Sequence, residues 1–379
     1  MKIVQVGDLE TSWKSMKVDS HSLHNACSRI CSFPLSIPKY FIDNYTEEGD
    51  VVFDPWSGKG TVPLEALVNK RIGIGNDKSP EAFILTHAKV NPPSVKEFKT
   101  YLDSLNGRMG SVKLGKKLSV LDRDARVFFS KSTFDQIRRV KELTRKDNTR
   151  VAIFTKAIVL GILHGSSSNA LSLRCSHSYS MSPNYVKKYA KEHGLRRPHK
   201  KVIEEILRKG LDVLSDKRPK KKGRALNSDS RDIGLKDNSV DMILGSPPYF
   251  DAQTYAWGNW LRLWFLGHNY KDVRSILTES GSKLVYGDFM RESSKELYRV
   301  LKPGGRCFIV VGDVNKRKKA GVVEVINTAE FILPGLLDAG FRAEKIVIDS
   351  IPQSKRVMTH KSKDAGIKTE RIIYLTKPN

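Results

Sequence analysis

Residues 50–77 read DVVFDPWSGKGTVPLEALVNKRIGIGND, and this stretch decides the fold class. Asp50–Phe53 predicts a short buried strand, Val62–Lys70 a helix and Arg71–Gly75 a second strand, because apolar runs of strand length flank a helical segment. Pro63 suits the first turn of that helix, where the amide proton that it lacks would have no intrahelical partner. This order of elements indicates a parallel α/β sheet.

The turn between the first strand and the helix carries Gly58 and Gly60. Glycine allows the backbone to turn sharply there and to approach a ligand without a Cβ in the way. Asp77 follows the second strand, 23 positions after Asp54. A doubly wound sheet places at this point the carboxylate that accepts hydrogen bonds from ribose hydroxyls. The spacing therefore predicts a cofactor that contains a nucleoside.

Helical periodicity replaces the strand signals in the middle of the chain, and the α/β pattern resumes near residue 225. The helices predicted in the middle are Ser132–Leu143, Arg150–Leu163 and Tyr185–Leu214. The later strands are Val240–Gly245, Arg306–Gly312, Lys345–Ile351 and Arg371–Thr376, the last two as a terminal hairpin, with a helix that ends near Leu301, a turn at PGG and a helix over Glu324–Ala339. We expect residues 1–95 and 225–379 to form the two halves of one α/β domain, and residues 96–224 to form a helical insertion.

The chain is strongly basic. Its 379 residues include 66 Lys and Arg against 41 Asp and Glu, a formal net charge of +25. Such a charge favours a polyanionic partner, with nucleic acid as the first candidate. Residues 187–224 hold fifteen Lys and Arg against five Asp and Glu and include the predicted loop KRPKKKGR (Lys217–Arg224). The pattern leaves open a solvated helix face or a surface that contacts phosphates.

Membrane, secretory and disulfide-rich classes are not indicated. No apolar run approaches the roughly 18 residues of a membrane helix. The first residues lack the apolar segment of a secretory signal. Four cysteines in the whole chain are too few for a disulfide scaffold. We expect a cytoplasmic protein with no membrane partner.

A second motif, SPPY (Ser246–Tyr249), directly follows the apolar run VDMILG. A tetrapeptide at the carboxyl end of a parallel strand lies where α/β sheets bind ligands. Two consecutive prolines fix the backbone and aim its carbonyl groups. Acceptor groups beside an aromatic ring suit an exocyclic base amine, while a plain loop after a strand is the simpler interpretation of the tetrapeptide alone.

Both motifs resemble those of S-adenosylmethionine-dependent amino methyltransferases that act on DNA. DPWSGKGT (Asp54–Thr61) is similar to the family's DPF-x-G-x-G-T motif, with Trp56 in place of phenylalanine, and SDSRDIGLKDNSVDMILGSPPY (Ser228–Tyr249) is similar to its second conserved region. The lead-in His21–Tyr45 is a looser match. The resemblance implies a Rossmann-like class I methyltransferase sheet, with residues 96–224 as a candidate DNA-recognition region.

The resemblance also implies site residues. The cofactor, S-adenosyl-L-methionine, would be held by Asp54, Pro55, Ser57, Gly58, Gly60, Thr61, Asp77, Lys78, Asp229 and Ser230. The catalytic group would be Ser246, Pro247, Pro248 and Tyr249. Tyr255 and Trp257 are further candidates to contact the base or the DNA, and Lys316–Lys319 and Arg356–Lys363 are basic loops expected near the cleft. No metal is required.

The implied reaction is direct methyl transfer to the N4 amine of cytosine in double-stranded DNA. The SPPY form is typical of cytosine-N4 enzymes, and DPPY or NPPY of adenine-N6 enzymes. The target amine is inaccessible in a duplex, so the base would be flipped into the pocket and stacked on Tyr249. Ser246 and the Pro247 carbonyl would accept the hydrogens of the amine.

Three alternatives remain at this point. The same machinery could methylate adenine N6 in DNA. An RNA base methyltransferase, for example one that acts on guanine N2 of tRNA, would share a related tetrapeptide. From a different class, the chain could be a catalytically inactive nucleic-acid-binding protein. The resemblance allows for a cognate restriction endonuclease in the same restriction-modification system and leaves open the recognition sequence and the oligomeric state.

Overall fold

A twisted sheet of eight strands lies at the centre of the computed structural model, which describes residues 2–5, 13–28, 33–165, 167–174, 182–250, 255–279, 281–317, 323–351 and 369–379. The strand order in the described residues is β1-β9-β10-β6-β5-β2-β3-β4, and β7 and β8 form a separate pair. The strands are β1 (Lys2–Gln5), β2 (Val51–Asp54), β3 (Ile72–Asn76), β4 (Arg224–Leu226), β5 (Val240–Gly245), β6 (Leu301–Gly312), β7 (Val314–Arg317), β8 (Val323–Ile326), β9 (Arg342–Ser350) and β10 (Thr369–Thr376).

Strand direction confirms the predicted fold class. The neighbours β4, β3, β2, β5 and β6 are all parallel, whereas β10 runs antiparallel to both β6 and β9. Helices lie in the connections from β2 to β3, from β3 to β4 and from β5 to β6, which is the arrangement of a doubly wound, Rossmann-like α/β sheet. β9 and β10 form the expected terminal pair, and β1 adds a parallel strand beside β9.

Helices cover both faces of the sheet, so alternate residues of each central strand enter different cores. Val52 and Met242 pack with α1 (Ser36–Tyr45) and α2 (Thr61–Val68) on one face. Phe53 and Ile243 pack with α13 (Lys283–Val300) and α14 (Thr328–Asp338) on the other. Burial on both faces explains why these strands read as continuous apolar runs in the sequence.

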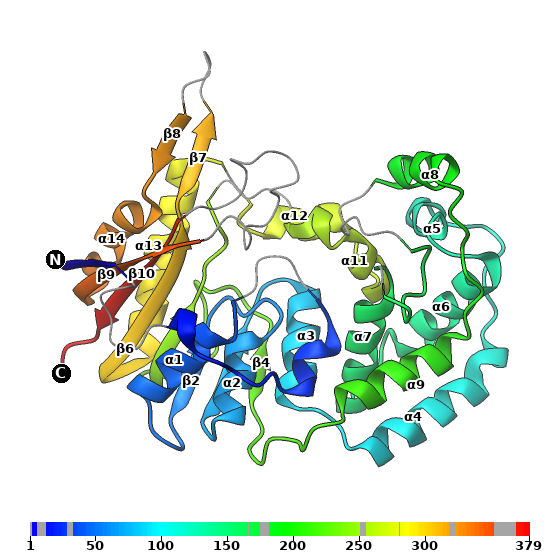
Figure 1. The fold of residues 1–379 in the computed structure, drawn as a ribbon, viewed down its shortest axis with the longest axis horizontal. Coiled ribbons are helices and arrows are strands. Elements are labelled where there is room, and N and C mark those ends of the chain that lie inside the picture. The colour runs from blue at the N-terminus through cyan, green and yellow to red at the C-terminus, as the bar shows by residue number, and fades with distance from the viewer. Residues whose placement is uncertain are drawn as a thin grey trace.

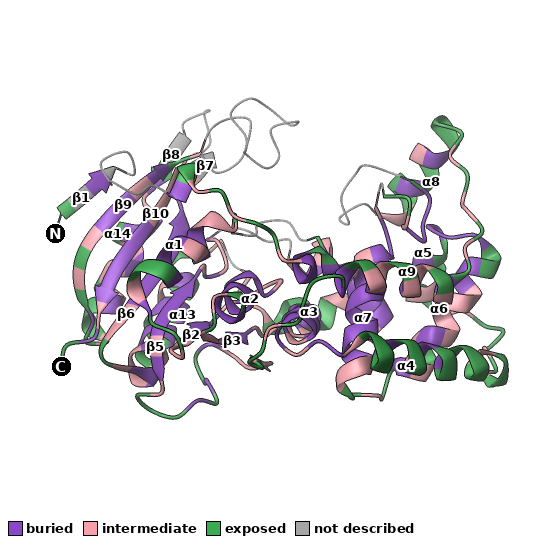
Figure 2. Cartoon of the chain, turned by 60° about the horizontal axis from the view of Figure 1, so that its bottom comes forward, coloured by how far each residue is buried: buried purple, intermediate pink, exposed green. Residues whose placement is uncertain are grey.

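A body of helices is inserted between α3 (Pro80–Val90) and β4. Its members are α4 (Val95–Arg108), α5 (Val120–Arg126), α6 (Lys131–Thr144), α7 (Arg150–Ile162), α8 (Pro183–Glu192) and α9 (Val202–Val213). One continuous core joins this helical insertion to α3 and to α11 (Trp260–Leu266). In Figure 2, α3 and α7 are buried over most of their length, while α4 shows an exposed face. The insertion is therefore anchored to the sheet through α3 and α11.

Several predicted boundaries were wrong for local physical reasons. The stretch 185–214 is two helices, because Gly194 has a positive φ of 58° and Pro198 follows it. Residues 323–326 form β8, so α14 begins at Thr328 and not at Glu324. The predicted PGG turn lies within β6, where Gly304 has a φ of 73°. The short strands β1, β4 and β7 carried no signal that we recognised.

The carboxyl ends of the parallel strands lie on one side of the molecule. In Figure 1, β6 runs upward into β7, and α12 (Tyr270–Ile276), α5 and α8 also lie towards the top of the view. α4 lies at the lower right, on the opposite side. Among the described helices, none is long and apolar enough to cross a membrane.

Candidate active site

The turn after β2 is closed by Asp77 from the end of β3. The Gly58 amide donates a hydrogen bond to Asp77 Oδ2 at 2.9 Å, and the Ser79 amide donates to Asp77 Oδ1 at 2.9 Å. Gly58 and Gly60 have positive φ values of 54° and 72°, which favour glycine. A Cβ on Gly60 would also lie 2.8 Å from the Thr86 Cα. The backbone conformation therefore favours glycine at positions 58 and 60, and position 60 also has no space for a Cβ.

Asn76 ties together the ends of three segments at this edge of the sheet. Its Nδ2 donates to the Pro55 carbonyl at 3.3 Å and to the Ser228 carbonyl at 3.0 Å. Its Oδ1 accepts from the Ser228 hydroxyl at 2.9 Å. Asn76 is buried, so these bonds satisfy a side chain that would be costly to bury unpaired. Our sequence reasoning missed this residue; its only signal was a polar side chain at the end of RIGIGN.

Asp229 is held by two cations. It accepts from Lys78 Nζ at 2.6 Å and from Arg231 through Nε and Nη2, each at 2.9 Å. Burial alone would raise the pKa of Asp229, but the hydrogen bonds from Arg231 and Lys78 hold that pKa well below its usual range. The structure thus brings three predicted cofactor residues, Asp77, Lys78 and Asp229, to one place.

The predicted hydroxyl residues of the cofactor site bond within the frame of the protein. Ser57 Oγ and Thr86 Oγ1 lie 2.9 Å apart, and the Ser57 amide donates to the Asn76 carbonyl at 2.8 Å. Ser230 Oγ lies 2.9 Å from Ser293 Oγ of α13. Thr61 is buried at the first position of α2. These contacts fix the turn, and direct contact of the hydroxyls with a cofactor stays a prediction.

Asp54 is a buried carboxylate that suits a cationic ligand. Its Oδ1 accepts from the Trp56 amide at 3.1 Å. Burial raises the pKa of Asp54 well above its usual range, and the nearby negative charge of Asp77 raises it further. A bound cation would relieve both effects. The sulfonium and ammonium groups of S-adenosylmethionine carry positive charge, so the residues present fit this cofactor.

The two sequence motifs meet at Gly245. β2 and β5 are neighbours in the sheet, and SPPY follows the last residue of β5. A Cβ on Gly245 would lie 2.9 Å from Pro55 Cδ and 3.0 Å from Asp54 Oδ1. The absence of a side chain therefore lets the start of the tetrapeptide lie directly against the DPW turn.

Tyr249 is held at its backbone by Tyr255, which the sequence singled out as a candidate to contact the base or the DNA, and at its hydroxyl by Glu370, which our sequence reasoning did not assign. Its amide donates to the hydroxyl of Tyr255 at 3.1 Å, and its own hydroxyl donates to Glu370 Oε1 at 2.8 Å. The Ser246 side chain also forms a hydrogen bond with Tyr249. Burial raises the pKa of Tyr249 well above its usual range, and burial also raises the pKa of Glu370. Glu370 lies 121 positions away and left no local signal.

The remaining aromatic and basic candidates divide in two. Tyr255 reaches the tetrapeptide as described, whereas Trp257 packs against Trp260, with ring centroids 6.2 Å apart, and against Tyr270 at 4.9 Å. The side chains of Lys316–Lys319 and the segment Arg356–Lys363 lie outside the described residues. Stacking of Tyr249 on a base also stays a prediction.

The chain matches the sequence model of the DNA methylase family over residues 5–87 and 240–379, together more than half of its length. No curated protein matches at a significant level. One similar structure is a SAM-dependent methyltransferase from Methanosarcina mazei, 12% identical, which covers 89% of this chain and 97% of that chain with a TM-score of 0.37.

A second similar structure is a protein assigned as a DNA modification methylase from Thermus thermophilus, solved in complex with S-adenosyl-L-methionine. It is 24% identical over 40% of this chain and 52% of that chain, with a TM-score of 0.26. The family match spans both motifs and leaves out the helical insertion. On this match, the chain belongs to the family of S-adenosylmethionine-dependent DNA methylases.

Proposed function

We propose that this chain transfers a methyl group from S-adenosylmethionine to the exocyclic N4 amine of cytosine in double-stranded DNA. The observation that carries the proposal is the contact of β5 with the DPW turn at Gly245, which places SPPY beside the buried Asp54 carboxylate. A cationic methyl donor held at that carboxylate would lie next to a loop of hydrogen-bond acceptors.

The cofactor would be held by the turn after β2 and by the carboxylates around it. Gly58 and Gly60 have positive φ values and carry no Cβ that a ligand would meet, and a bound cation would favour the charged form of Asp54, whose pKa burial raises. Asp77 accepts hydrogen bonds from the Gly58 and Ser79 amides, which shape the turn, and its carboxylate oxygens are the type of acceptor that would bind ribose hydroxyls. When bound, the cofactor supplies an electrophilic methyl group on a sulfonium.

The tetrapeptide would bind and orient the amine. Its nitrogen lone pair is delocalised into the base, so the nitrogen must become more tetrahedral as the new C–N bond forms. Ser246 Oγ and the Pro247 carbonyl favour that geometry by accepting the amine hydrogens, and proximity of the two reactants supplies much of the remaining acceleration. The proton that the amine loses would leave through Ser246 or directly to solvent.

Tyr249 and its partners would form one wall of the base pocket. Hydrogen bonds to Tyr255 and Glu370 restrain the residue at its backbone and at its hydroxyl. A ring restrained at both ends loses little further freedom when a flipped base stacks on it. Cytosine is favoured over adenine because the tetrapeptide begins with Ser246, the form typical of cytosine-N4 enzymes.

Methyl transfer from labelled S-adenosylmethionine tests the proposal, with unmethylated duplex DNA of mixed sequence and bulk RNA as parallel substrates. We expect label in the DNA and its loss in Ser246→Ala. Ser104→Ala is a matched control, because Ser104 is exposed on α4, away from the site, and should keep full activity. Label in RNA alone, or equal activity in Ser246→Ala and Ser104→Ala, would overturn the proposal.

A further inference from the structure

A concave pocket of about 450 Å³ opens in the helical insertion, between α5, the start of α6 and α8. Five cationic side chains line it: Arg123, Arg126, Lys131, Lys187 and Arg197. We call this the basic pocket. Among the described residues that line it, none is acidic. Its floor is partly apolar, with Val127 and Phe129 buried beneath the cations.

The five cations lack carboxylate partners in the described part of the chain. Arg197 is held by a hydrogen bond, because its Nε donates to the Val127 carbonyl at 2.6 Å. Like charges gathered in one concavity repel one another, and a bound anion removes that cost. The arrangement therefore points to an anionic ligand.

The N-terminus of α6 adds to the positive potential of the basic pocket. Ser130, the N-cap residue of this 14-residue helix, lines the pocket beside Lys131. The first turn of α6 contains no acidic residue that would neutralise the helix dipole. The five side chains and the N-terminus of α6 therefore all favour the binding of an anion.

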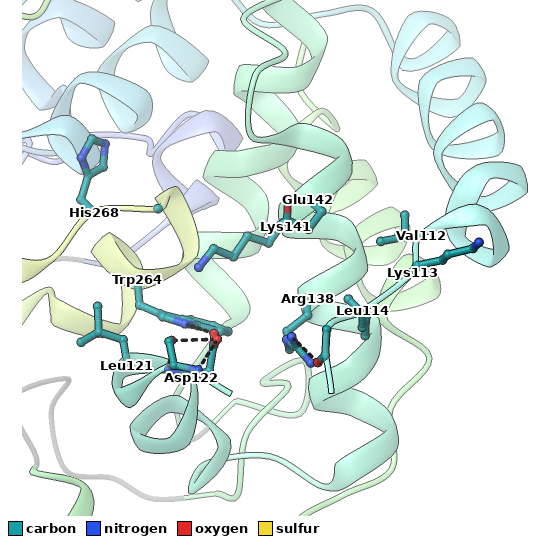
Figure 3. A pocket seen from close by; sticks show the side chains of 13 residues that line it. Val112, Lys113, Leu114, Leu121, Asp122, Arg138, Lys141, Glu142, Trp264 and His268 are labelled. Carbon is teal, nitrogen blue, oxygen red and sulfur yellow. Dashed lines mark hydrogen bonds between the residues drawn. The ribbon is translucent and has the colours of Figure 1, made fainter. Parts of the chain in front are cut away.

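A second pocket, of about 310 Å³, lies between the insertion and the end of α11 and differs in its chemistry (Figure 3). There Lys141 lies over the Trp264 ring at 4.6 Å from its centroid, and Asp122 accepts a hydrogen bond from the indole at 3.0 Å. Glu142 also lines this pocket. Its cations are balanced by carboxylates and by an aromatic ring, so it is a weaker anion site than the basic pocket.

The basic pocket lies on the side of the molecule that carries the active site. α5 and α8 are on the same side as the carboxyl end of β6 and the β7–β8 pair in Figure 1, and Figure 2 shows the same relationship. A long, regularly charged polymer that reaches the tetrapeptide could therefore extend over the basic pocket. A site for a single free anion would not need to lie on the same side of the molecule as the active site.

We propose that the basic pocket binds backbone phosphates of the DNA duplex that enters the active site. This inference rests on the proposed function. It identifies a second place, away from the target base, at which the protein would hold the duplex. Lysine and arginine contacts to phosphates fix the register of a protein on DNA and carry no base information directly. The basic pocket accordingly positions the duplex and does not read its sequence.

Salt dependence of DNA binding tests this inference without any need for methyl transfer. The test variant is Arg123→Gln/Arg126→Gln, and the matched control is Lys96→Gln/Lys99→Gln, which removes the same charge from exposed positions on α4. Binding of a fluorescent duplex of mixed sequence is measured by anisotropy across a range of salt concentrations. Thermal unfolding confirms that each variant is folded.

We expect the slope of log affinity against log salt to shrink by up to about 2 in the test variant, at about 0.9 for each phosphate that the protein no longer neutralises. The loss of affinity should be equal for duplexes of different sequence, and the control should keep the wild-type slope. An unchanged slope in the test variant, or equal changes in both variants, would overturn the inference. So would a loss confined to a competing RNA, or full displacement of duplex by millimolar inorganic phosphate at constant ionic strength.

The two proposals can fail separately. A chain that binds duplex DNA through the basic pocket but gives no label in it would contradict the proposed reaction and leave the phosphate site standing. If the protein methylates DNA but Arg123→Gln/Arg126→Gln leaves the salt slope unchanged, the proposed reaction stands and the phosphate site is contradicted.

Discussion

The Tyr249 hydroxyl donates a hydrogen bond to Glu370 across 2.8 Å, and this contact joins the predicted catalytic tetrapeptide to the last strand of the sheet. β10 is antiparallel to β6, so its first residues lie beside the carboxyl end of β6, with Glu370 opposite Gly312. Because β10 runs antiparallel to β6, the Glu370 carboxyl near the start of β10 lies at the edge of the sheet where the parallel strands end. Glu370 is a positioning residue, because it acts through Tyr249.

Removal of either partner of this hydrogen bond should lower the rate of methyl transfer. Tyr249→Phe takes the hydrogen-bond donor from the half-buried Glu370 carboxyl, at a cost in folding stability of about 1–3 kcal/mol. In a double-mutant cycle with Glu370→Ala, the effects on kcat should be non-additive, because the second change removes a group that has already lost its partner. Glu370→Gln, which keeps an acceptor, should restore part of the activity. Strict additivity in kcat would show that the contact has no role in orienting Tyr249.

Asp54→Asn should separate stability from cofactor binding. Burial raises the pKa of Asp54, so the folded state loses stability as pH rises through that raised pKa. The asparagine variant has no charge to bury and should gain stability over wild type as pH rises from about 5 to about 8 without cofactor. Its affinity for S-adenosylmethionine should fall by about tenfold or more, because a charge-assisted contact is worth about 1.5–3 kcal/mol.

Thermal unfolding at several pH values and titration calorimetry measure these two effects of Asp54→Asn. A variant that is less stable than wild type under mildly alkaline conditions and still binds the cofactor with wild-type affinity would show that Asp54 is a purely structural residue.

The buried Lys89 makes the stability of the protein depend on pH. It is fully buried on α3, and its Nζ has no hydrogen-bond partner in the described part of the chain. Burial, together with the smaller effect of the nearby charge of Lys59, lowers the pKa of Lys89 to about 7. Its unfolded pKa is higher, so the stability that the neutral amine allows is complete above the unfolded pKa and is lost as pH falls to about 7.

Lys89→Met should therefore stabilise the protein at about pH 7 by about 3–5 kcal/mol, and the gain should shrink towards about pH 10. Urea denaturation at several pH values across this range measures the gain. A gain that stays constant across the range would mean that Lys89 finds a partner for its charge in the folded protein.

Gly60→Ala should damage the cofactor turn, whereas Gly107→Ala should not. Alanine at Gly60 must adopt a φ of 72° and place its Cβ 2.8 Å from the Thr86 Cα, so we expect a loss of stability of about 1–3 kcal/mol and weaker cofactor binding. Gly107 lies within α4 with open space around its Cβ position, where alanine should stabilise the helix by about 1 kcal/mol. Equal effects of the two changes on Tm would contradict this account of the turn.

The sequence predicted what is determined locally. The run VDMILG matches the bounds of β5, since a strand buried on both faces is continuously apolar. The glycine turn and SPPY were recognised because the glycines and prolines that these backbone conformations require are close together in the sequence. β4 was missed because its three residues follow a run of lysines and are held by pairing with β3. Asn76 and Glu370 were missed because their partners, Ser228 and Tyr249, lie more than a hundred positions away.

The identity of the methylated nucleoside tests the central claim most directly. Duplex DNA of mixed sequence is incubated with the protein and labelled S-adenosylmethionine, digested to nucleosides and analysed by mass spectrometry. We predict N4-methylcytosine. N6-methyladenine would contradict the assignment of the base, and 5-methylcytosine would contradict direct transfer to an exocyclic amine at Ser246–Tyr249.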